Sequence, residues 1–455
     1  MAGIKRVIFE ALGTFRMAEK IVKIGLVGFG TVGAGVAKII LEQSELIAAK
    51  TGIKLELACV VDKDTTSERP ITLPAGLLTN DLNKLLGDAS IEIAVELVGG
   101  TTFAKQLQLN MLKAGKDVVT ANKALLAEAG RELINAAHDN DRCIAFEASC
   151  AGGIPIISAL RTGLVANDIT DMYGIVNGTC NYILSSMTAK NESFKDALAK
   201  AQKLGYAEAD PTLDINGSDS THKLVIMASI AFGYEIKLKD VYREGIEDVS
   251  IDDIRYASEL GYCLKLLAIA QKDDQGKISL RVHPALISKD NSIAKVGGSF
   301  NVVSVFGNAS GQVSFYGRGA GSMPTASAVV ADILEVAIGN SKRTFQQMTF
   351  KPLDDSNEII QKIDTLVSRF YIRLMCEDQP GVLSQWSRIL ADENISVAAV
   401  LQHEGKGPEN TAPVVILTHP AKQKNINEAL KKIKKLDSVG AKPICIRIVD
   451  IPEDN

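Results

Sequence analysis

Acidic residues and a lysine lie close together in the segment 205–223, in a pattern suited to carbonyl chemistry. Asp219 and Lys223 are four residues apart in a stretch whose composition predicts a helix, so they share one helix face. The residues after Lys223 are apolar, which indicates a position at a buried edge. A lysine there can polarise a carbonyl or protonate a forming alkoxide, and the acids can hold a substrate ammonium. A surface ion pair is the alternative, and it is the commoner outcome of this spacing.

A second lysine, Lys123, follows the strand-like residues Val118–Thr120. The ends of strands in parallel sheets form the crevice in which ligands bind. Lys123 is therefore a candidate for contact with a nicotinamide or with a substrate carbonyl. An ordinary lysine at the start of a helix explains its position equally well.

A glycine-rich turn matches the GxGxxG pattern with Gly28, Gly30 and Gly33. It follows the apolar run Ile21–Val27 and opens a helical stretch that ends near Lys50. The first glycine permits the tight turn, the second lets the backbone approach a pyrophosphate, and the third lets the helix pack on the sheet. The helix N-terminus then offers its N–H groups to the phosphates. We predict a dinucleotide site, and a purely structural glycine turn is the alternative.

Asp62 lies at the end of the second expected strand, where a carboxylate accepts hydrogen bonds from the adenosine ribose hydroxyls and repels a 2′-phosphate. This position favours NAD over NADP. The adjacent Lys63 can neutralise a phosphate, and the spacing from the glycines is longer than usual. An ordinary loop acid therefore remains an alternative for Asp62.

The elements around these residues predict an α/β protein with several domains. Alternating strands and helices over 21–150 indicate a Rossmann-type, doubly wound parallel sheet with helices on both faces. Mixed helices and strands over 151–340 indicate an α+β domain whose last helix returns to the first domain. Polar residues 341–367 read as a linker, and 368–455 follow the ferredoxin-like order βαββαβ. Residues 1–20 are expected to be an N-terminal extension.

Composition narrows the possible partners. The chain has 455 residues, 46% of them hydrophobic, and a net charge of −4, which argues against nucleic acid and acidic membrane surfaces and favours a small-molecule partner. The seven cysteines are scattered and form no CxxC pair, which argues against a zinc site and for a reducing, cytoplasmic location. We see no apolar run of the roughly 18 residues that a membrane span requires.

Six motifs, in the family's order, resemble homoserine dehydrogenase, and together they span about 300 residues. They are GFGTVG at 28–33, TANK at 120–123, EASCAGGIP at 147–155, NGTCNYIL at 177–184, LGYAEADPTLDINGSDSTHK at 204–223 and GRGAGSMPTASAVV at 317–330. The resemblance implies reversible, NAD(P)H-dependent reduction of L-aspartate 4-semialdehyde to L-homoserine, in threonine and methionine biosynthesis. It also implies a homodimer or homotetramer, in which the central domain binds substrate and dimerises.

The resemblance assigns roles to single residues. Lys223 matches the family's proton donor, Lys123 matches the lysine beside cofactor and substrate, and Glu208 and Asp219 match the acids that bind homoserine. Further positions match residues that line the cofactor, namely Phe29, Thr31, Val32, Gly205 and Gly321.

The family also holds a monovalent cation, usually sodium. The matching ligands are the Glu147 carboxylate and the backbone carbonyls of Cys150, Gly152 and Ile154, and an ordinary acid in a helix-start turn is the alternative. One departure from the family is Cys180, which stands where threonine is usual.

The segment from Cys376 resembles the DxPGVL turn of ACT domains, which bind amino acids. The matching effector positions are Asp378, Gly381, Val382 and Leu383. Threonine, as the end product of the pathway, is the expected effector. A dimerisation module that has lost its ligand is the alternative.

Two other functions compete with this interpretation. One is a different Rossmann oxidoreductase that acts on an amino-acid-derived carbonyl, such as an aspartate dehydrogenase, against which NGTCNYIL and the segment 208–223 argue together. The other is a catalytically silent amino-acid sensor that uses only the ACT domain. The intact Lys123, Lys223, Glu208 and Asp219 argue against the sensor.

Overall fold

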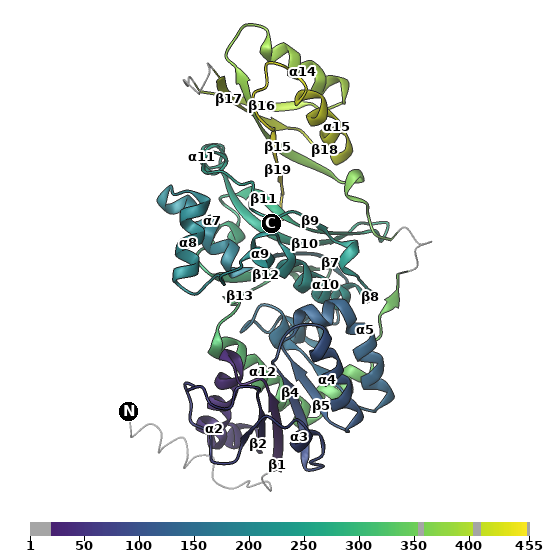
Figure 1. Cartoon of the computed structure of the whole chain (residues 1–455). Helices are drawn as coiled ribbons and strands as arrows, with labels where there is room; N and C mark the ends of the chain where they lie inside the picture. The colour runs from purple at the N-terminus through teal and green to yellow at the C-terminus, as the bar shows by residue number, and fades with distance from the viewer. Residues whose placement is uncertain (1–19, 354–358, 404–410, 453–455) are drawn as a thin grey trace, which may run out of the picture. The chain divides into compact units, whose positions relative to one another are not determined.

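A computed structural model describes residues 20–353, 359–403 and 411–452, so the expected N-terminal extension lies almost wholly outside the described residues. The chain forms two compact units (Figure 1). The first unit comprises the chain up to Ile157 together with Ala320–Thr349, and the second comprises Ser158–Gly319 and the chain from Phe350. The domain boundaries expected from the sequence remain predictions.

The first unit is built on a six-stranded sheet in the order β3-β2-β1-β4-β5-β6, and every pairing in it is parallel. Its strands are β1 (Lys20–Val27), β2 (Ile53–Val61), β3 (Leu78–Thr79), β4 (Ile91–Glu96), β5 (Asp117–Thr120) and β6 (Ile144–Ala145). The central strand β1 buries Ile24 and Leu26 on one face and Gly25 and Val27 on the other, as expected for a strand covered on both faces. The predicted Rossmann-type sheet is confirmed.

Among its described residues, the first unit also contains six α-helices of four residues or more, and two of them pack tightly on each other. They are α2 (Thr31–Thr51), α3 (Asn83–Leu86), α4 (Thr102–Lys113), α5 (Lys123–Asp139), α12 (Ser322–Ile338) and α13 (Asn340–Gln346). The helices α2 and α12 lie side by side (Figure 1). A Cβ added at Gly35 would come within 2.9 Å of the Ala326 Cβ, so the small residue permits this close approach. The helix α13 occupies the start of the segment 341–367, where the sequence indicates a linker.

The second unit contains one long sheet, with the strand path β13-β12-β7-β10-β11-β19-β15-β17-β16. The bounds are β7 (Ile169–Ile175), β10 (Tyr262–Lys272), β11 (Ile278–Ser288), β12 (Phe300–Gly307), β13 (Gly311–Arg318), β15 (Val367–Glu377), β16 (Val397–Gln402), β17 (Thr411–Thr418) and β19 (Ile444–Ile448). Off this path, β9 (Tyr242–Arg243) pairs with β11 and β18 (Ala421–Lys422) pairs with β15.

The helices that hold the site in this unit precede β10 in sequence. They are α7 (Gly178–Lys190), α8 (Phe194–Lys203), α9 (Thr212–Ile215) and α10 (Ser218–Phe232), and α11 (Ile251–Glu259) follows them. The helix predicted around Asp219 and Lys223 corresponds to α10.

The C-terminal part has the order β15, α14 (Val382–Asp392), β16, β17, α15 (Gln423–Ile433), β19, which confirms the predicted βαββαβ pattern. Its core includes Leu374 from β15, Trp386 from α14, Ile416 from β17 and Ile426 from α15. Both helices therefore pack on one face of the strands β19-β15-β17-β16, where they lie side by side (Figure 1).

The C-terminal strands continue the central sheet, which the sequence did not predict. The strand β19 pairs in parallel with β11, with Ala285 opposite Arg447 and Leu286 opposite Ile448. This pairing joins residues about 160 positions apart, so no local pattern could indicate it. Among the described residues, no single helix is long and apolar enough to span a membrane, and α12 and α13 pass that test only as a pair bent by 82°.

Candidate active site

The helix α10 carries the acid and the lysine that the sequence singled out. It begins after Gly217, which takes a left-handed conformation, and Asp219 and Lys223 are on successive turns. The Lys223 Nζ lies 2.7 Å from the Asp219 Oδ2 and donates to the Val176 carbonyl at 2.6 Å. Both side chains are only 9% exposed, so the alternative of a surface ion pair is wrong. Burial of such a pair is tolerated because each partner compensates the charge of the other.

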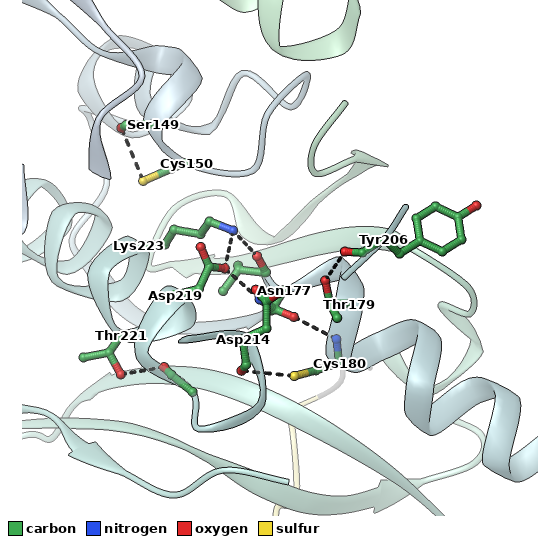
Figure 2. A network of polar contacts seen from close by, with 12 residues as sticks. Ser149, Cys150, Asn177, Thr179, Cys180, Tyr206, Asp214, Asp219, Thr221 and Lys223 are labelled. Atoms are coloured by element: carbon green, nitrogen blue, oxygen red, sulfur yellow. Dashed lines mark hydrogen bonds and ion pairs between the residues drawn. The ribbon is translucent and has the colours of Figure 1, made fainter. Parts of the chain in front are cut away.

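Asn177 connects this pair to a second acid (Figure 2). It caps the N-terminus of α7, since its Oδ1 accepts from the Cys180 amide at 2.8 Å. Its Nδ2 donates to the Asp219 Oδ2 at 2.9 Å and to the Asp214 Oδ1 at 2.7 Å. Sequence reasoning gave Asn177 and Asp214 no role. The available signal was an asparagine directly before a helix, where N-caps are common.

Asp214 and Cys180 also belong to this network, in which Asp214 is half-buried and Cys180 is buried. Burial raises the pKa of the Asp214 carboxyl, and the hydrogen bond from Asn177 opposes that change. The Cys180 thiol donates to the Asp214 carbonyl at 3.2 Å, and burial raises its pKa well above 9.0. Cys180 is therefore a protonated thiol.

Glu208 and Gly205 lie in the mostly exposed turn 205–210, whereas Lys223 is buried. Gly205 has a left-handed φ of 74°, and both it and Glu208 are exposed. The backbone carbonyl of Glu208 accepts from the Gln202 side chain at 3.2 Å. Within the part of the chain that the structure describes, the Glu208 carboxylate takes no part in the hydrogen-bond network around Lys223.

In the first unit, the glycine-rich turn has the shape of a dinucleotide loop. Gly28 has a φ of 98°, and a Cβ at Gly33 would meet the Gly28 carbonyl oxygen at 2.0 Å. A Cβ at Gly30 would meet nothing within 4 Å, so the backbone there borders open space. The first and third glycines are required by the fold, and the second leaves the room that a pyrophosphate needs.

The flanking residues of this turn differ in exposure. The Phe29 side chain is 1% exposed and packs inward, whereas Thr31 is exposed and Val32 half-buried. The Ser322 hydroxyl donates to the Thr31 carbonyl at 2.7 Å, next to Gly321, which has a φ of 121° and precedes α12. The predicted cofactor positions Thr31 and Gly321 thus lie close together in this unit.

Asp62 contacts the glycine-rich turn directly. Its Oδ2 accepts from the Phe29 amide at 2.5 Å and its Oδ1 accepts from the Asp64 amide at 2.9 Å. Lys63 instead lies over the Phe103 ring, with its Nζ 5.8 Å from the ring centroid. The carboxylate therefore stands beside the loop, at the end of β2, where a ribose-binding acid belongs.

Lys123 is the first residue of α5, and Asn122 caps that helix by accepting from the Leu125 amide at 3.2 Å. A buried acid that the sequence analysis did not identify, Glu96, connects the end of β4 to the end of β5. Its Oε2 accepts from Gln108 and from Thr120, each at 2.8 Å. Lys123 thus lies half-buried at the start of α5, shortly after the end of β5.

The predicted cation ligands surround a sharp bend after β6. The Glu147 side chain is buried, and its Oε1 accepts from the Ile157 amide at 2.8 Å. Ala151 and Gly152 have consecutive left-handed φ values of 54° and 55°. Among the described residues, no group of three or more His, Cys, Asp and Glu side chains could hold a metal. One carboxylate with backbone carbonyls is an all-oxygen donor set, which suits a hard cation better than a transition metal.

The predicted effector turn lies between β15 and α14. Gly381 has a φ of 95° and Val382 is buried, whereas Leu383 is 57% exposed. The Gln402 side chain donates to the Asp378 Oδ1 at 3.4 Å, which links the turn to β16.

Models of three known sequence families match successive segments of the chain. They are described as the homoserine dehydrogenase NAD-binding domain over residues 28–147, homoserine dehydrogenase over 155–334, and the ACT domain over 370–438. Homoserine dehydrogenase of Neisseria gonorrhoeae is 43% identical, over 93% of this chain and 98% of that protein.

Solved structures agree with these matches. A homoserine dehydrogenase from Thiobacillus denitrificans has a TM-score of 0.85 and 40% identity, over 95% of this chain and 99% of that one. A hyperthermophilic archaeal homoserine dehydrogenase mutant, solved in complex with NADPH, has a TM-score of 0.58 and 29% identity, over 70% of this chain and 98% of that one. The chain therefore belongs to the homoserine dehydrogenase family and carries a nicotinamide-binding domain and a C-terminal ACT domain.

Proposed function

We propose that Lys223 is the acid–base group of the dehydrogenase reaction, which interconverts L-homoserine and L-aspartate 4-semialdehyde. The nicotinamide cofactor, when bound, supplies or accepts the hydride. In the direction of reduction, negative charge grows on the aldehyde oxygen, and the Lys223 ammonium stabilises that oxygen and donates a proton to it. In oxidation, the Lys223 amine takes the hydroxyl proton. The buried ion pair with Asp219 carries this proposal, since it fixes the ammonium in one position.

The remaining site residues hold and orient the substrate in this proposal. Asp219 accepts the substrate ammonium together with Glu208, and Asn177 keeps the Asp219 carboxylate in place by donating to it. Lys123, the first residue of α5, is assigned to contact with cofactor and substrate. The support for Glu208 and Lys123 is the match of their motifs to the family.

We infer NAD as the preferred cofactor. The Asp62 carboxylate beside the glycine-rich turn favours ribose hydroxyls and repels a 2′-phosphate. The archaeal relative with NADPH indicates that the family fold can also accept the phosphorylated cofactor. The cofactor is held through the backbone at Gly28, Gly30 and Gly33, with Gly321 as a further contact. Gly205 is kept as a cofactor residue on the match of its motif to the family alone.

We infer a monovalent cation, sodium, at the bend that contains Glu147, Cys150, Gly152 and Ile154. The bound ion would add positive charge beside a buried carboxylate and hold the bend after β6 in one conformation. Cys150 would contribute its carbonyl oxygen only.

We also infer that threonine is the effector, bound at the turn Asp378–Leu383, and that the enzyme works as a homodimer or homotetramer. The ACT domain supports an amino-acid effector. Its left-handed Gly381 leaves the backbone accessible to a small ligand.

One set of rates tests these points together. Initial rates of homoserine oxidation are followed at the nicotinamide absorbance with NAD and with NADP, each with and without threonine and with sodium or a large organic cation. Faster turnover with NAD, inhibition by threonine and stimulation by sodium are expected. Equal rates with both cofactors would contradict the role of Asp62, and threonine-insensitive rates would contradict the effector.

A further inference from the structure

Glu96 is the last residue of β4, and its side chain is completely buried. Its Oε1 accepts from the Val98 and Gly99 amides, at 2.8 and 3.2 Å. Its Oε2 accepts from the Gln108 side chain and from the Thr120 hydroxyl, each at 2.8 Å. A buried carboxylate is costly unless donors of this kind compensate it. The carboxylate therefore connects the loop that follows β4 with the end of β5.

These contacts belong to a closed ring of hydrogen bonds. The Thr120 hydroxyl donates to the carboxylate at 2.8 Å and accepts from the Asn122 amide at 3.0 Å. The Asn122 side chain donates to the Gly100 carbonyl at 2.8 Å, which brings the ring back to the loop 97–100. Asn122 also caps α5, whose first residue is Lys123. The ring therefore fixes the loop 97–100 against the turn that precedes Lys123.

The ring lies on the side of the sheet that is expected to receive the nicotinamide. A dinucleotide crosses the carboxyl ends of the strands where the strand order reverses, which here is next to β1 in the order β3-β2-β1-β4-β5-β6. Asp62 follows β2 and marks the adenosine side, so β4 and β5 border the other half. A Cβ at Gly28 would come within 2.6 Å of the Leu97 carbonyl oxygen, so the loop 97–100 reaches the glycine-rich turn. The loop therefore borders the crevice on its nicotinamide side.

Backbone sterics do not hold this loop in one conformation. Gly99 and Gly100 have consecutive left-handed φ values of 72° and 73°. Both residues are exposed, and a Cβ at either would meet nothing within 4 Å. Glycines in such surroundings have access to several backbone conformations. The position of the loop therefore depends on its hydrogen bonds to Glu96 and Asn122.

We propose that Glu96 is a positioning residue of the dehydrogenase reaction. It holds the loop 97–100 and the turn before Lys123 in one arrangement, and these two segments shape the part of the crevice that receives the nicotinamide ring. The adenosine half is held by the glycine-rich turn and Asp62, so it does not depend on the ring of hydrogen bonds. The inference rests on the proposed reaction for its kinetic consequence, whereas its consequence for dinucleotide binding is independent of turnover.

Four variants of the full chain test the proposal. Glu96→Leu removes both acceptor oxygens, and Thr120→Val opens the ring while it keeps the branched shape of the strand end. Glu96→Gln is the conservative variant: the Gln108 Oε1 is buried and has no hydrogen-bond partner among the described residues, so the Gln108 amide can turn and accept from the new amide group. Lys116→Met is the matched control, because Lys116 is also buried in this unit but precedes β5, at the opposite end of that strand.

Calorimetric titrations compare the dissociation constants for NADH and for ADP-ribose, which lacks the nicotinamide ring. Glu96→Leu and Thr120→Val should weaken NADH binding by about threefold or more and leave ADP-ribose binding within about twofold. Glu96→Gln should retain most of the NADH affinity. Lys116→Met should lower the thermal unfolding midpoint and leave both dissociation constants unchanged. Equal losses of NADH and ADP-ribose affinity, or an unchanged NADH affinity in Thr120→Val, would overturn the proposal.

Rates of homoserine oxidation in the same samples supply the kinetic consequence. Glu96→Leu and Thr120→Val should lower kcat by about tenfold or more, because small displacements of reacting groups cost large factors in rate. The isotope effect with homoserine deuterated at its hydroxyl-bearing carbon should rise, since hydride transfer then limits turnover. An unchanged kcat and isotope effect in Thr120→Val would overturn the proposal. If the unmodified protein did not oxidise homoserine, the proposed reaction would fail, and the two dissociation constants would still decide the role of Glu96.

Discussion

Replacing Lys223 by methionine separates the catalytic role of the lysine from its structural role. The substitution keeps most of the side-chain volume and removes the ammonium that lies 2.7 Å from the Asp219 Oδ2. It therefore removes a proton donor and leaves a buried carboxylate without its cation. The first consequence lowers kcat and the second lowers the stability, and a second substitution can restore only the stability.

The catalytic loss follows from the loss of a preorganised donor. Removing one such donor from a developing oxyanion costs about 100- to 1000-fold in kcat, which is roughly 3–4 kcal/mol. The structural loss follows from breaking a buried pair, since Lys223 and Asp219 are each 9% exposed on the side chain. Removing one partner of such a pair costs roughly 3–5 kcal/mol of stability.

A second substitution distinguishes these effects. In Lys223→Met combined with Asp219→Asn, the uncompensated charge is gone and the residue at 219 can still accept from Asn177. Most of the lost stability should return, as measured by urea denaturation. Turnover should not return, because no proton donor has been restored.

Lys265→Met is a matched control, because Lys265 is also a buried lysine of the second unit. Its Nζ donates to the Val296 carbonyl at 2.6 Å and to Asn181, and burial lowers its pKa. This variant should lose stability and keep a kcat close to that of the unmodified enzyme, once rates are expressed per folded molecule.

The assay compares kcat for homoserine oxidation with dinucleotide affinity from fluorescence titration. Lys223→Met should lower kcat about 100-fold or more and change dinucleotide affinity little. Equal losses in both quantities, or recovery of kcat in the double variant, would refute the assigned role.

Three further predictions concern the cofactor loop and the pH dependence of stability. Gly30→Ala should weaken dinucleotide binding without lowering the thermal unfolding midpoint. Gly33→Ala should lower both the dinucleotide affinity and the midpoint, because its Cβ would collide with the Gly28 carbonyl. A lower midpoint for Gly30→Ala than for Gly33→Ala would contradict this. Asp62→Ala should reduce the preference for NAD over NADP by about tenfold in kcat/KM, and an unchanged ratio would remove Asp62 from cofactor selection. Burial holds the pKa of His283 well below 6.5, so the stability that its neutral form provides is present above pH 6.5 and is lost as the pH falls below that value. Urea denaturation of His283→Phe between pH 7.5 and roughly pH 5 should therefore give a flatter dependence, by up to about 1.4 kcal/mol per pH unit, and parallel curves would count against it.

Local patterns in the sequence determined most of the fold class. The glycine-rich turn between an apolar strand and a helix was sufficient to predict the dinucleotide loop, because backbone sterics at Gly28 and Gly33 act over a few residues. The order of elements from β15 to β19 followed from short-range hydrophobic periodicity. Asp219 and Lys223 were also placed on one helix face by their spacing alone.

Contacts between distant segments were decided only by the tertiary structure. The spacing of Asp219 and Lys223 favoured an exposed ion pair, and their burial follows from packing against the segment of Val176, about 45 residues earlier in the chain. Asn177 and Asp214 joined the network for the same reason.

The junction of the central and C-terminal strands was equally hidden in the sequence. The pairing of β19 with β11 depends on strand register, which is set by which faces become buried when the whole sheet assembles. Periodicity specifies which face of an element is apolar, but not which other element covers that face. The free energy of burial that determines which elements pair comes from residues far apart in sequence. These residues meet only in the folded structure, so a local pattern does not reveal the pairing.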